Sequence, residues 1–376
     1  MACDPAELAV PGVRSLAPYE PGKPIETLAR EHGLEPAGII KLASNENPRG
    51  PSPQALSAAR EALDGVHRYP DGAGTGLREH LAARHSVESA AITLGNGSND
   101  VLDMIARTFL GPGRNAVFSR HAFAVYPIST RVAGAAARVA PACPADHPEA
   151  PYGHDLDAMA ALVDADTRVV FIANPNNPTG TWVERAAVER FLETVPQHVI
   201  VVLDEAYSEY VREPEFPNGI CWLSRFPNLV VTHTFSKIHG LAGLRCGYAI
   251  SSPAMADLLN RVRHPFNVNS TALAAAEAAL SDEAFIVESA RINAEGLARL
   301  EAGFRELGLA PIPSVANFVS VDVGRPAGPV YEALLTEGVI VRPVGGYELP
   351  QHLRVTVGTE TENARVLDAL ARVLAL

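Results

Sequence analysis

The sequence predicts an α/β protein with a large domain, built on a mainly parallel sheet sandwiched by helices, and a smaller α+β domain. Strand-length apolar runs alternate with helical segments from residue 91 to residue 235, which is typical of parallel sheets with helical crossovers. After residue 263, alanine-rich helices come first and further strands follow. The 376 residues also exceed what one hydrophobic core usually organises. We expect an arm and part of the small domain at 1–42, the large domain at 43–263 and the C-terminal small domain at 264–376.

Composition and charge exclude several classes of protein. A formal charge of −12, without any dense block of lysine and arginine, argues against nucleic acids and anionic membranes as partners. Residues 1–7 are acidic and lack the basic start and apolar core of a signal peptide. The four cysteines are too dispersed for a disulfide framework, and the histidines lack the spacing of a metal site. We therefore expect a cytoplasmic protein that acts on small molecules and holds no metal.

The N-terminal segment, up to Pro24, contains too many prolines for a helix or a central strand, so we expect an extended arm. The elements expected next are a helix at Ile25–His32, a strand at Ile39–Leu42, a polar turn at Ser44–Pro48, a helix at Gln54–Leu63, a glycine-rich loop at 67–76 and a helix at Leu77–His85. This part of the chain therefore starts in one domain and enters the other.

A strand at Ala91–Leu94, a glycine-containing turn and a helix at Val101–Phe109 follow one another. The turn carries Gly97, Ser98 and Asn99. Free backbone N–H groups at a helix N-terminus, helped by a capping serine, favour a phosphate. The turn does not match G-x-G-x-x-G, because an aspartate stands at the last glycine position. A tight structural turn is an equal alternative.

Further strands of the large domain end in polar residues. The strands are expected at Asn115–Ser119, Thr167–Ala173, Val199–Leu203 and Leu229–Phe235, and the helices beside them at Tyr126–Ala137, Leu156–Val163 and Val183–Thr194. The carboxyl ends of parallel strands lie at one edge of a sheet, where α/β proteins bind ligands. We expect Asn177, Asp204, Tyr207 and Lys237 to meet at that edge.

Lys237 follows an apolar strand and precedes three closely spaced glycines, at which backbone turns tightly or approaches another group. In apolar surroundings the ammonium form of a lysine loses hydration, so its amine can act as a nucleophile and a base. Arg245, further along the same loop, offers a planar cation that suits a phosphate. The alternative is an ordinary, solvated turn lysine.

The last part of the chain is expected to form helices at Thr271–Leu280, Ile286–Leu307 and Glu362–Leu374, and strands at Phe318–Val323, Val339–Val341 and Leu353–Val357. Arg342 and Arg354 stand among the apolar residues of these strands. A buried arginine is costly without an anionic partner. Each arginine is therefore either part of a structural ion pair or an anchor for an anionic substrate.

These residues together suit pyridoxal phosphate. A lysine amine can condense with the aldehyde of this cofactor, Asp204 can pair with its ring nitrogen, and Asn177 and Tyr207 can hydrogen-bond its phenolic oxygen. Their order resembles that of the fold-type I aminotransferases over nearly the full chain. Within that group, the segments that resemble the histidinol-phosphate aminotransferase family are PYEPGKP (18–24), KLASNENP (41–48), RYPDG (68–72), GNGSND (95–100), NPNNPTG (174–180), DEAY (204–207), TFSK (234–237), GLAGLR (240–245) and LRVTVGT (353–359).

The resemblance implies a role for each residue. Lys237 would be the catalytic lysine, and Phe123 would stack on the cofactor ring. The phosphate of the cofactor would be held by Gly97, Ser98, Asn99, Ser236 and Arg245. Tyr69 would reach that phosphate from the neighbouring subunit, which implies a homodimer with shared active sites. The substrate would be held by Tyr19, Asn45, Arg342 and Arg354.

The activity implied by the resemblance is transamination of L-histidinol phosphate with 2-oxoglutarate in histidine biosynthesis. An aromatic-amino-acid aminotransferase and a decarboxylase of a phosphorylated amino acid such as phosphothreonine are the rival enzymes. A cofactor-binding transcriptional regulator would need a DNA-binding domain and a basic face, and the sequence has neither. Two residues depart from the family pattern, because Phe123 and His239 stand where tyrosine is usual. For His239 we expect packing near the subunit interface rather than tuning of the site.

Overall fold

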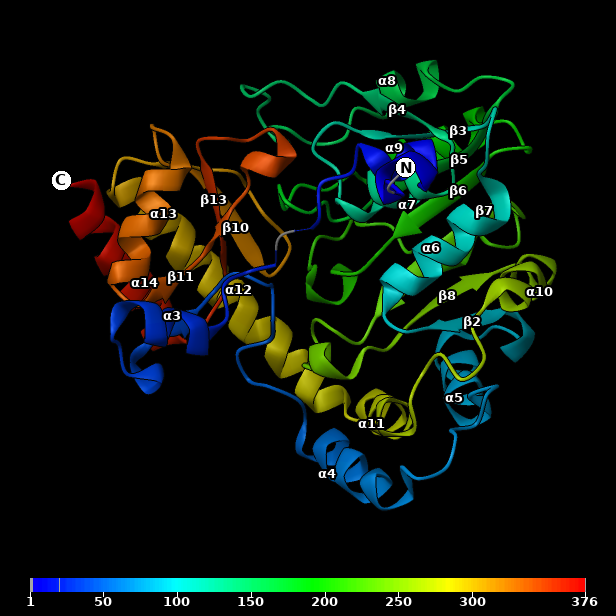
Figure 1. Ribbon diagram of the computed structural model, residues 1–376, viewed down its shortest axis with the longest axis horizontal. Coiled ribbons are helices and arrows are strands. Elements are labelled where there is room, and N and C mark those ends of the chain that lie inside the picture. The colour runs from blue at the N-terminus through cyan, green and yellow to red at the C-terminus, as the bar shows by residue number, and fades with distance from the viewer. Residues whose placement is uncertain (1–2, 20, 376) are drawn as a thin grey trace.

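The computed structural model describes residues 3–19 and 21–375, which form two domains side by side (Figure 1). The large domain contains a seven-stranded sheet with the order β2 (Ile92–Gly95), β8 (Gly247–Ser251), β7 (Leu229–Thr234), β6 (Ile200–Asp204), β5 (Thr167–Ala173), β3 (Asn115–Ser119) and β4 (Ala136–Ala140). Its neighbouring strands are parallel, except that β8 is antiparallel to β2 and β7. The predicted mainly parallel sheet is confirmed.

Helices cover both faces of this sheet, because its central strands are apolar on both sides. On one face, α6 (Ser98–Phe109), α7 (Val125–Val132) and α10 (Pro253–Val262) enclose a core. On the other, α8 (Leu156–Ala161) and α9 (Arg185–Thr194) enclose a second core. A third core joins β2 and β8 to α4 (Pro53–Ala62), α5 (Thr75–His85) and α11 (Ser270–Leu280). The carboxyl ends of β5, β6 and β7 are thereby held in fixed positions.

Several predicted elements of the large domain need correction. Helix α7 ends at Val132 and not at Ala137, because Gly134 takes a φ of +78° and Ala136–Ala140 then pairs with β3 as strand β4. The alanines of β4 favour a helix, and pairing at the sheet edge overrides that preference. The prediction also missed β8 and α10, because β8 starts with a glycine at the end of a glycine-rich loop.

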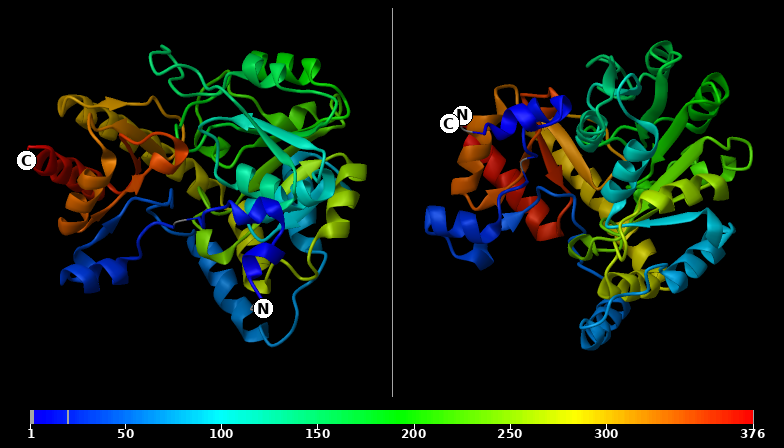
Figure 2. Two further views of the ribbon diagram at one scale, coloured as in Figure 1. Left: turned by 45° about the horizontal axis from the view of Figure 1, so that its top comes forward. Right: turned by 45° about the vertical axis from the view of Figure 1, so that its right-hand side comes forward.

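The N-terminal arm is less extended than predicted. It contains two one-turn helices, α1 (Pro5–Leu8) and α2 (Pro11–Arg14). Each begins at a proline, whose missing N–H is harmless in the first turn of a helix. A Cβ on Gly12 would lie 1.9 Å from the carbonyl oxygen of Arg131, so α2 touches α7 closely. Figure 2 shows both short helices over the large domain. Residues 1–2, 20 and 376, which the predicted domains include, lie outside the described residues.

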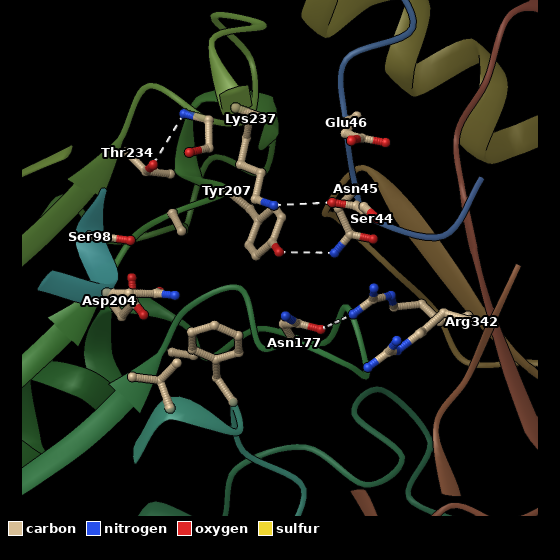
Figure 3. A pocket seen from close by; sticks show the side chains of 18 of the residues that line it. Ser44, Asn45, Glu46, Ser98, Asn177, Asp204, Tyr207, Thr234, Lys237 and Arg342 are labelled. Atoms are coloured by element: carbon tan, nitrogen blue, oxygen red, sulfur yellow. Dashed lines mark hydrogen bonds between the residues drawn. The ribbon is translucent and has the colours of Figure 1, made fainter. Parts of the chain in front are cut away.

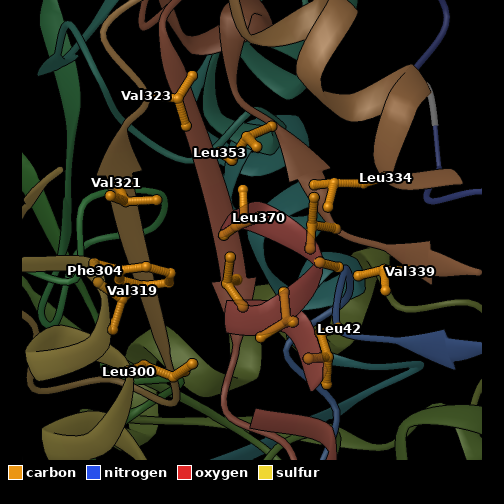
Figure 4. Close-up of a cluster of buried hydrophobic side chains, with 14 of the residues drawn as sticks. Leu42, Leu300, Phe304, Val319, Val321, Val323, Leu334, Val339, Leu353 and Leu370 are labelled. Carbon is orange, nitrogen blue, oxygen red and sulfur yellow. The ribbon is translucent and has the colours of Figure 1, made fainter. Parts of the chain in front are cut away.

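The small domain combines α3 (Ile25–His32), α12 (Glu283–Glu306), α13 (Ala327–Thr336) and α14 (Glu360–Leu374) with short strands. One sheet has the order β12 (Arg342–Pro343), β13 (His352–Thr356), β10 (Phe318–Asp322) and β9 (Ala310–Pro311), and β1 (Ile40–Lys41) pairs with β11 (Val339–Ile340). Helix α13 was not predicted. The core in Figure 4 includes Phe304, Leu334 and Leu370 from the helices. It also includes Leu42, so the N-terminal segment completes this domain.

The position of the domain boundary stays a prediction. Helix α11 packs on α4 and α5 and shares their core, which is part of the large domain. In the next helix, α12, Leu297 and Phe304 belong to the core of the small domain. We therefore propose that the boundary lies between α11 and α12 rather than at residue 263.

Candidate active site

A cavity of about 420 Å³ lies where the carboxyl ends of β5, β6 and β7 face β12 and β13 (Figure 3). Thirteen of the residues singled out in the sequence line it, namely Tyr19, Asn45, Ser98, Asn99, Phe123, Asn177, Asp204, Tyr207, Ser236, Lys237, Arg245, Arg342 and Arg354. Two do not. Gly97 lies directly behind Arg245, and Tyr69 lies on the surface of the large domain. The structure thus brings together residues from both domains and from the N-terminal arm.

Lys237 is held on a tight turn that follows β7. The backbone N–H of Gly240 donates to the Lys237 carbonyl oxygen at 2.9 Å, which closes the turn. The Lys237 amine donates to the carbonyl oxygen of Ser44 at 3.3 Å, and Figure 3 shows it pointing into the cavity. Burial, and secondarily the charge of Arg354, lowers the pKa of Lys237 to about 8. A solvated turn lysine is therefore excluded, and the amine can lose its proton near neutral pH.

Asp204, at the end of β6, is buried and accepts a hydrogen bond on each carboxylate oxygen. The Tyr126 hydroxyl donates to Oδ2 at 2.8 Å, and the Thr232 hydroxyl donates to Oδ1 at 3.0 Å. Burial raises the pKa of Asp204, and these hydrogen bonds limit the rise. The carboxylate makes no salt bridge within the described residues, although its charge is costly to bury alone. It therefore suits a cationic ligand atom, such as a protonated ring nitrogen.

The sequence interpretation missed Tyr126 and Thr232. Tyr126 is fully buried and stacks on Phe171 with ring centroids 4.7 Å apart, which fixes the direction of its hydroxyl. Thr232 follows the apolar start of strand β7, and this change from apolar to polar residues was a usable signal. No local pattern in the sequence pointed to Tyr126, because it reaches Asp204 from a helix far away along the chain.

Tyr207 and Asn177 present polar groups to the middle of the cavity. The Tyr207 hydroxyl accepts a hydrogen bond from Asn45 Nδ2 at 2.9 Å, and burial raises the pKa of Tyr207 to about 12. Tyr207 is therefore a neutral hydrogen-bond donor at physiological pH. Asn177 lies on the turn after β5 and accepts a hydrogen bond from Arg354 at 2.5 Å. Both side chains can bind an oxygen atom of a ligand.

The turn that was predicted to bind phosphate leads directly into α6, which begins at Ser98 rather than at Val101. Gly97 has a φ of +80°, and a Cβ at this position would lie 2.3 Å from Arg245 Nη2. Glycine thus lets the guanidinium approach the helix N-terminus. Arg245 also donates to the Ser236 hydroxyl at 3.3 Å. A helix N-terminus, two serine hydroxyls and a guanidinium therefore converge, and this donor set fits a phosphate monoester.

The small-domain wall of the cavity consists of Arg354 and Arg342, which are directly opposite each other on β13 and β12. Arg354 is 5% exposed, donates to the Ala43 carbonyl oxygen at 2.8 Å, and pairs with no carboxylate among the described residues. Its buried Nε has no hydrogen-bond partner there either. The guanidinium of Arg342 lies 5.3 Å from the centre of the Tyr19 ring. A structural ion pair is therefore excluded for Arg354, and its orphaned donor fits an anionic ligand.

Two predicted residues lie outside this arrangement. Tyr69 is 81% exposed and stacks on Phe266, with ring centroids 4.6 Å apart, on the surface of its own chain. It does not contact the cavity within this chain, so its predicted role depends on a second subunit. His239 is buried behind the turn of Lys237 and hydrogen-bonds Glu209.

The described residues contain no group of three or more histidine, cysteine or acidic side chains that could hold a metal ion. Within 3–19 and 21–375, no helix is long and apolar enough to cross a membrane. The donors around the cavity instead fit pyridoxal phosphate, with its phosphate, its cationic ring nitrogen and its aldehyde facing complementary groups.

Comparison with known proteins agrees with this site. Residues 37–370 match the model of the family "Aminotransferase class I and II". The chain belongs to this family, and it is a pyridoxal-phosphate-dependent aminotransferase with the fold-type I architecture. It is 60% identical to the histidinol-phosphate aminotransferases 2 of Pseudomonas fluorescens and Pseudomonas aeruginosa, over 98% of this chain and 98% of each relative. Within the aminotransferases it belongs to the histidinol-phosphate aminotransferase family.

A solved structure supports the same assignment. The histidinol-phosphate aminotransferase of Sinorhizobium meliloti in complex with pyridoxal 5′-phosphate is similar with a TM-score of 0.87 and 29% identity. The match covers 98% of this chain and 97% of that one.

Proposed function

We propose that this enzyme transfers the amino group of L-histidinol phosphate to 2-oxoglutarate, giving imidazole-acetol phosphate and L-glutamate, as a step of histidine biosynthesis. The names of its 60% identical relatives support this donor. The observation that carries the proposal is the pair Arg342 and Arg354, which face the Lys237 amine across the cavity. A guanidinium pair suits a phosphate on the donor and a carboxylate on the acceptor.

Each wall of the site would hold one part of the cofactor. Asp204 would bind the ring nitrogen, Asn177 and Tyr207 the phenolic oxygen, and Phe123 one face of the ring. The phosphate would be held by Gly97, Ser98, Asn99, Ser236 and Arg245, and the Tyr69 hydroxyl of a second subunit would complete this set. When bound, pyridoxal phosphate supplies an aldehyde for the donor amine and a ring that can store an electron pair.

The protein side chains then move one proton and orient the substrate. The Lys237 amine takes the proton from the Cα of the donor, for which a pKa of about 8 is well matched. Hydrogen bonds from Tyr126 and Thr232 favour the ionised form of Asp204 against the effect of its burial. Arg354, Arg342, Tyr19 and Asn45 hold the donor so that its Cα faces Lys237. With 2-oxoglutarate the same groups act in the reverse direction.

The substrate assignment is tested by measuring kcat/KM for histidinol phosphate, histidinol, phenylalanine and phosphothreonine. We expect kcat/KM for histidinol phosphate to exceed that for histidinol by a wide margin, because each charge-assisted hydrogen bond to phosphate contributes about 1.5–3 kcal/mol, or roughly ten- to a hundredfold. Arg342→Ala should reduce kcat/KM for histidinol phosphate more than for phenylalanine. If kcat/KM for phenylalanine equals that for histidinol phosphate, the enzyme is an aromatic-amino-acid aminotransferase. Release of CO₂ from phosphothreonine would instead indicate the decarboxylase.

We also propose that the enzyme is a homodimer with shared active sites and that it acts in the cytoplasm. Tyr69 supports the dimer, because an exposed aromatic ring stacked on Phe266 suits a contact with another chain. Mixing the inactive variants Tyr69→Ala and Lys237→Ala under subunit exchange checks this. Each hybrid dimer has one intact site and one site with both defects, so part of the activity should return. If activity does not return although exchange is demonstrated, Tyr69 does not act across an interface.

A further inference from the structure

We infer that His239 and Glu209 are positioning residues for Lys237, an inference that rests on the catalytic role proposed for this lysine. His239 lies two residues after Lys237, and Glu209 lies two residues after Tyr207. Their side chains join the turn that carries the lysine to the turn that carries the tyrosine. Neither residue lines the cavity.

The contact between the two side chains is direct and shielded. His239 is 4% exposed, and its Nε2 lies 3.0 Å from Glu209 Oε1. The imidazole packs against Phe235, the residue after β7, with ring centroids 4.9 Å apart. Burial opposes ionisation of Glu209, yet His239, together with the charges of His233 and Arg84, holds the pKa of Glu209 below its usual range. The geometry is thus that of a charge-assisted hydrogen bond.

The opposite side of the lysine turn is held by the segment Ser44–Gly50. Asn47 Nδ2 donates to the Ile238 carbonyl oxygen at 2.7 Å. Gly240 has a φ of +69°, and a Cβ there would lie 2.1 Å from the Gly50 carbonyl oxygen. The first residue of this segment, Ser44, accepts the hydrogen bond of the Lys237 amine. The turn is therefore clamped between this segment and Glu209.

In this arrangement His239 and Glu209 help to fix the position of the Lys237 amine nitrogen. A buried, hydrogen-bonded carboxylate often adds little to stability compared with apolar residues of the same size, so its presence here needs another explanation. A misplacement of about 1 Å in a reacting group can cost roughly a hundredfold in rate. Without the pair, the Lys237 turn loses its anchor on the Tyr207 side while the Ser44 side is unchanged. We therefore expect the amine to become less confined and better hydrated.

The test compares two substitutions of His239 that differ in one hydrogen bond. Glutamine places an amide Nε2 about as far from the backbone as the imidazole Nε2 and can donate to Glu209, whereas leucine cannot. We expect H239L and E209L each to lower kcat for histidinol phosphate about tenfold with little change in KM. H239Q should recover most of the loss. The double variant H239L/E209L should be no worse than the poorer single variant, because both remove the same contact.

A second measurement needs no donor substrate, so its result does not depend on which donor the enzyme uses. In the holoenzyme, the pH titration of the cofactor absorbance reports on the nitrogen of Lys237. We expect its midpoint to rise by roughly half to one pH unit in H239L and E209L, because a better hydrated nitrogen holds its proton more tightly. His80→Phe is the control, since the His80 ring hydrogen-bonds the Gly76 carbonyl oxygen at 2.9 Å within α5 and lies outside both turns.

Unchanged midpoints together with additive losses of kcat would overturn the positioning role. A lowered melting temperature without any change in kcat or in the titration midpoint would also overturn it, because the pair would then support only the fold. Trapping of the cofactor on another lysine by borohydride would instead remove the proposed role of Lys237 itself. The two failures are therefore distinguishable.

Discussion

The two walls of the active site are built in different ways. On the large-domain wall, Asp204 and Lys237 lie at the ends of neighbouring strands, and buried side chains on other elements hydrogen-bond to Asp204. On the small-domain wall, Arg342 and Arg354 come from two short antiparallel strands, and Arg354 keeps an unpaired buried donor. Both carboxylate oxygens of Asp204 accept hydrogen bonds, whereas the Nε of Arg354 has no partner among the described residues. This difference suits a wall that holds a permanent cofactor and a wall that exchanges two anionic substrates.

The largest expected effect concerns the large-domain wall. Lys237→Ala should fold and still bind pyridoxal phosphate noncovalently, because the phosphate donors around Ser98 and Arg245 lie apart from the amine. Turnover should fall by about 10⁴-fold or more, since the variant lacks both the nucleophile and the base. The measurement is single-turnover kinetics, combined with borohydride reduction of the wild type and peptide mapping. Cofactor found on a different lysine would contradict the assignment.

A smaller effect should follow when the support of Asp204 is weakened. Tyr126→Phe keeps the stacking on Phe171 and removes one hydrogen bond to the carboxylate, so the pKa of Asp204 should rise further. We expect kcat to fall about tenfold with little change in KM for the donor. Tyr331→Phe, on a half-buried tyrosine of α13, is the matched control in the small domain. If Tyr126→Phe and Tyr331→Phe lowered kcat equally, the proposed difference between the two walls would be wrong.

The same contrast explains how far the sequence could predict the molecule. The ends of β5, β6 and β7 were predictable, because each buried apolar run stops at polar residues such as Asn177, Asp204 and Lys237. The arginines were conspicuous as charges among apolar strand residues. Strand β4 was missed, because most of this edge strand is not buried and its alanines favour a helix.

Contacts between distant segments were beyond the reach of the sequence. Tyr126 reaches Asp204 from a helix, and His239 was expected to pack near a subunit interface although it hydrogen-bonds Glu209 of its own chain. Nothing in the local pattern of either residue records its partner, because both bonds form only when separate turns meet at the sheet edge. The role of Tyr69 stays a prediction, because it depends on a second chain.

The smallest expected effect concerns stability and arises behind the large-domain wall. Glu205, next to Asp204, is 3% exposed and accepts a hydrogen bond from the Gly219 N–H at 2.8 Å. Burial raises the pKa of Glu205 from 4.5 to about 8. Burial likewise lowers the pKa of the adjacent His233 from 6.5 to about 4. Of these two groups, both act between pH 4.5 and 6.5, in opposite directions, and only Glu205 acts between pH 6.5 and about 8.

In that window the folded state holds a proton on Glu205 that the unfolded state has released, so the free energy of unfolding should decrease as the pH rises. The decrease is at most about 2 kcal/mol, at 1.36 kcal/mol per pH unit. Glu205→Gln keeps an acceptor for Gly219 and cannot titrate, so its denaturant midpoint should be nearly constant between pH 6.5 and 8. Glu348→Gln, an exposed carboxylate paired with Arg120 at the small-domain side, should retain the wild-type slope. If the slope survives in Glu205→Gln, it does not arise from Glu205, and the cost of buried charge assigned here to the large-domain wall is wrong.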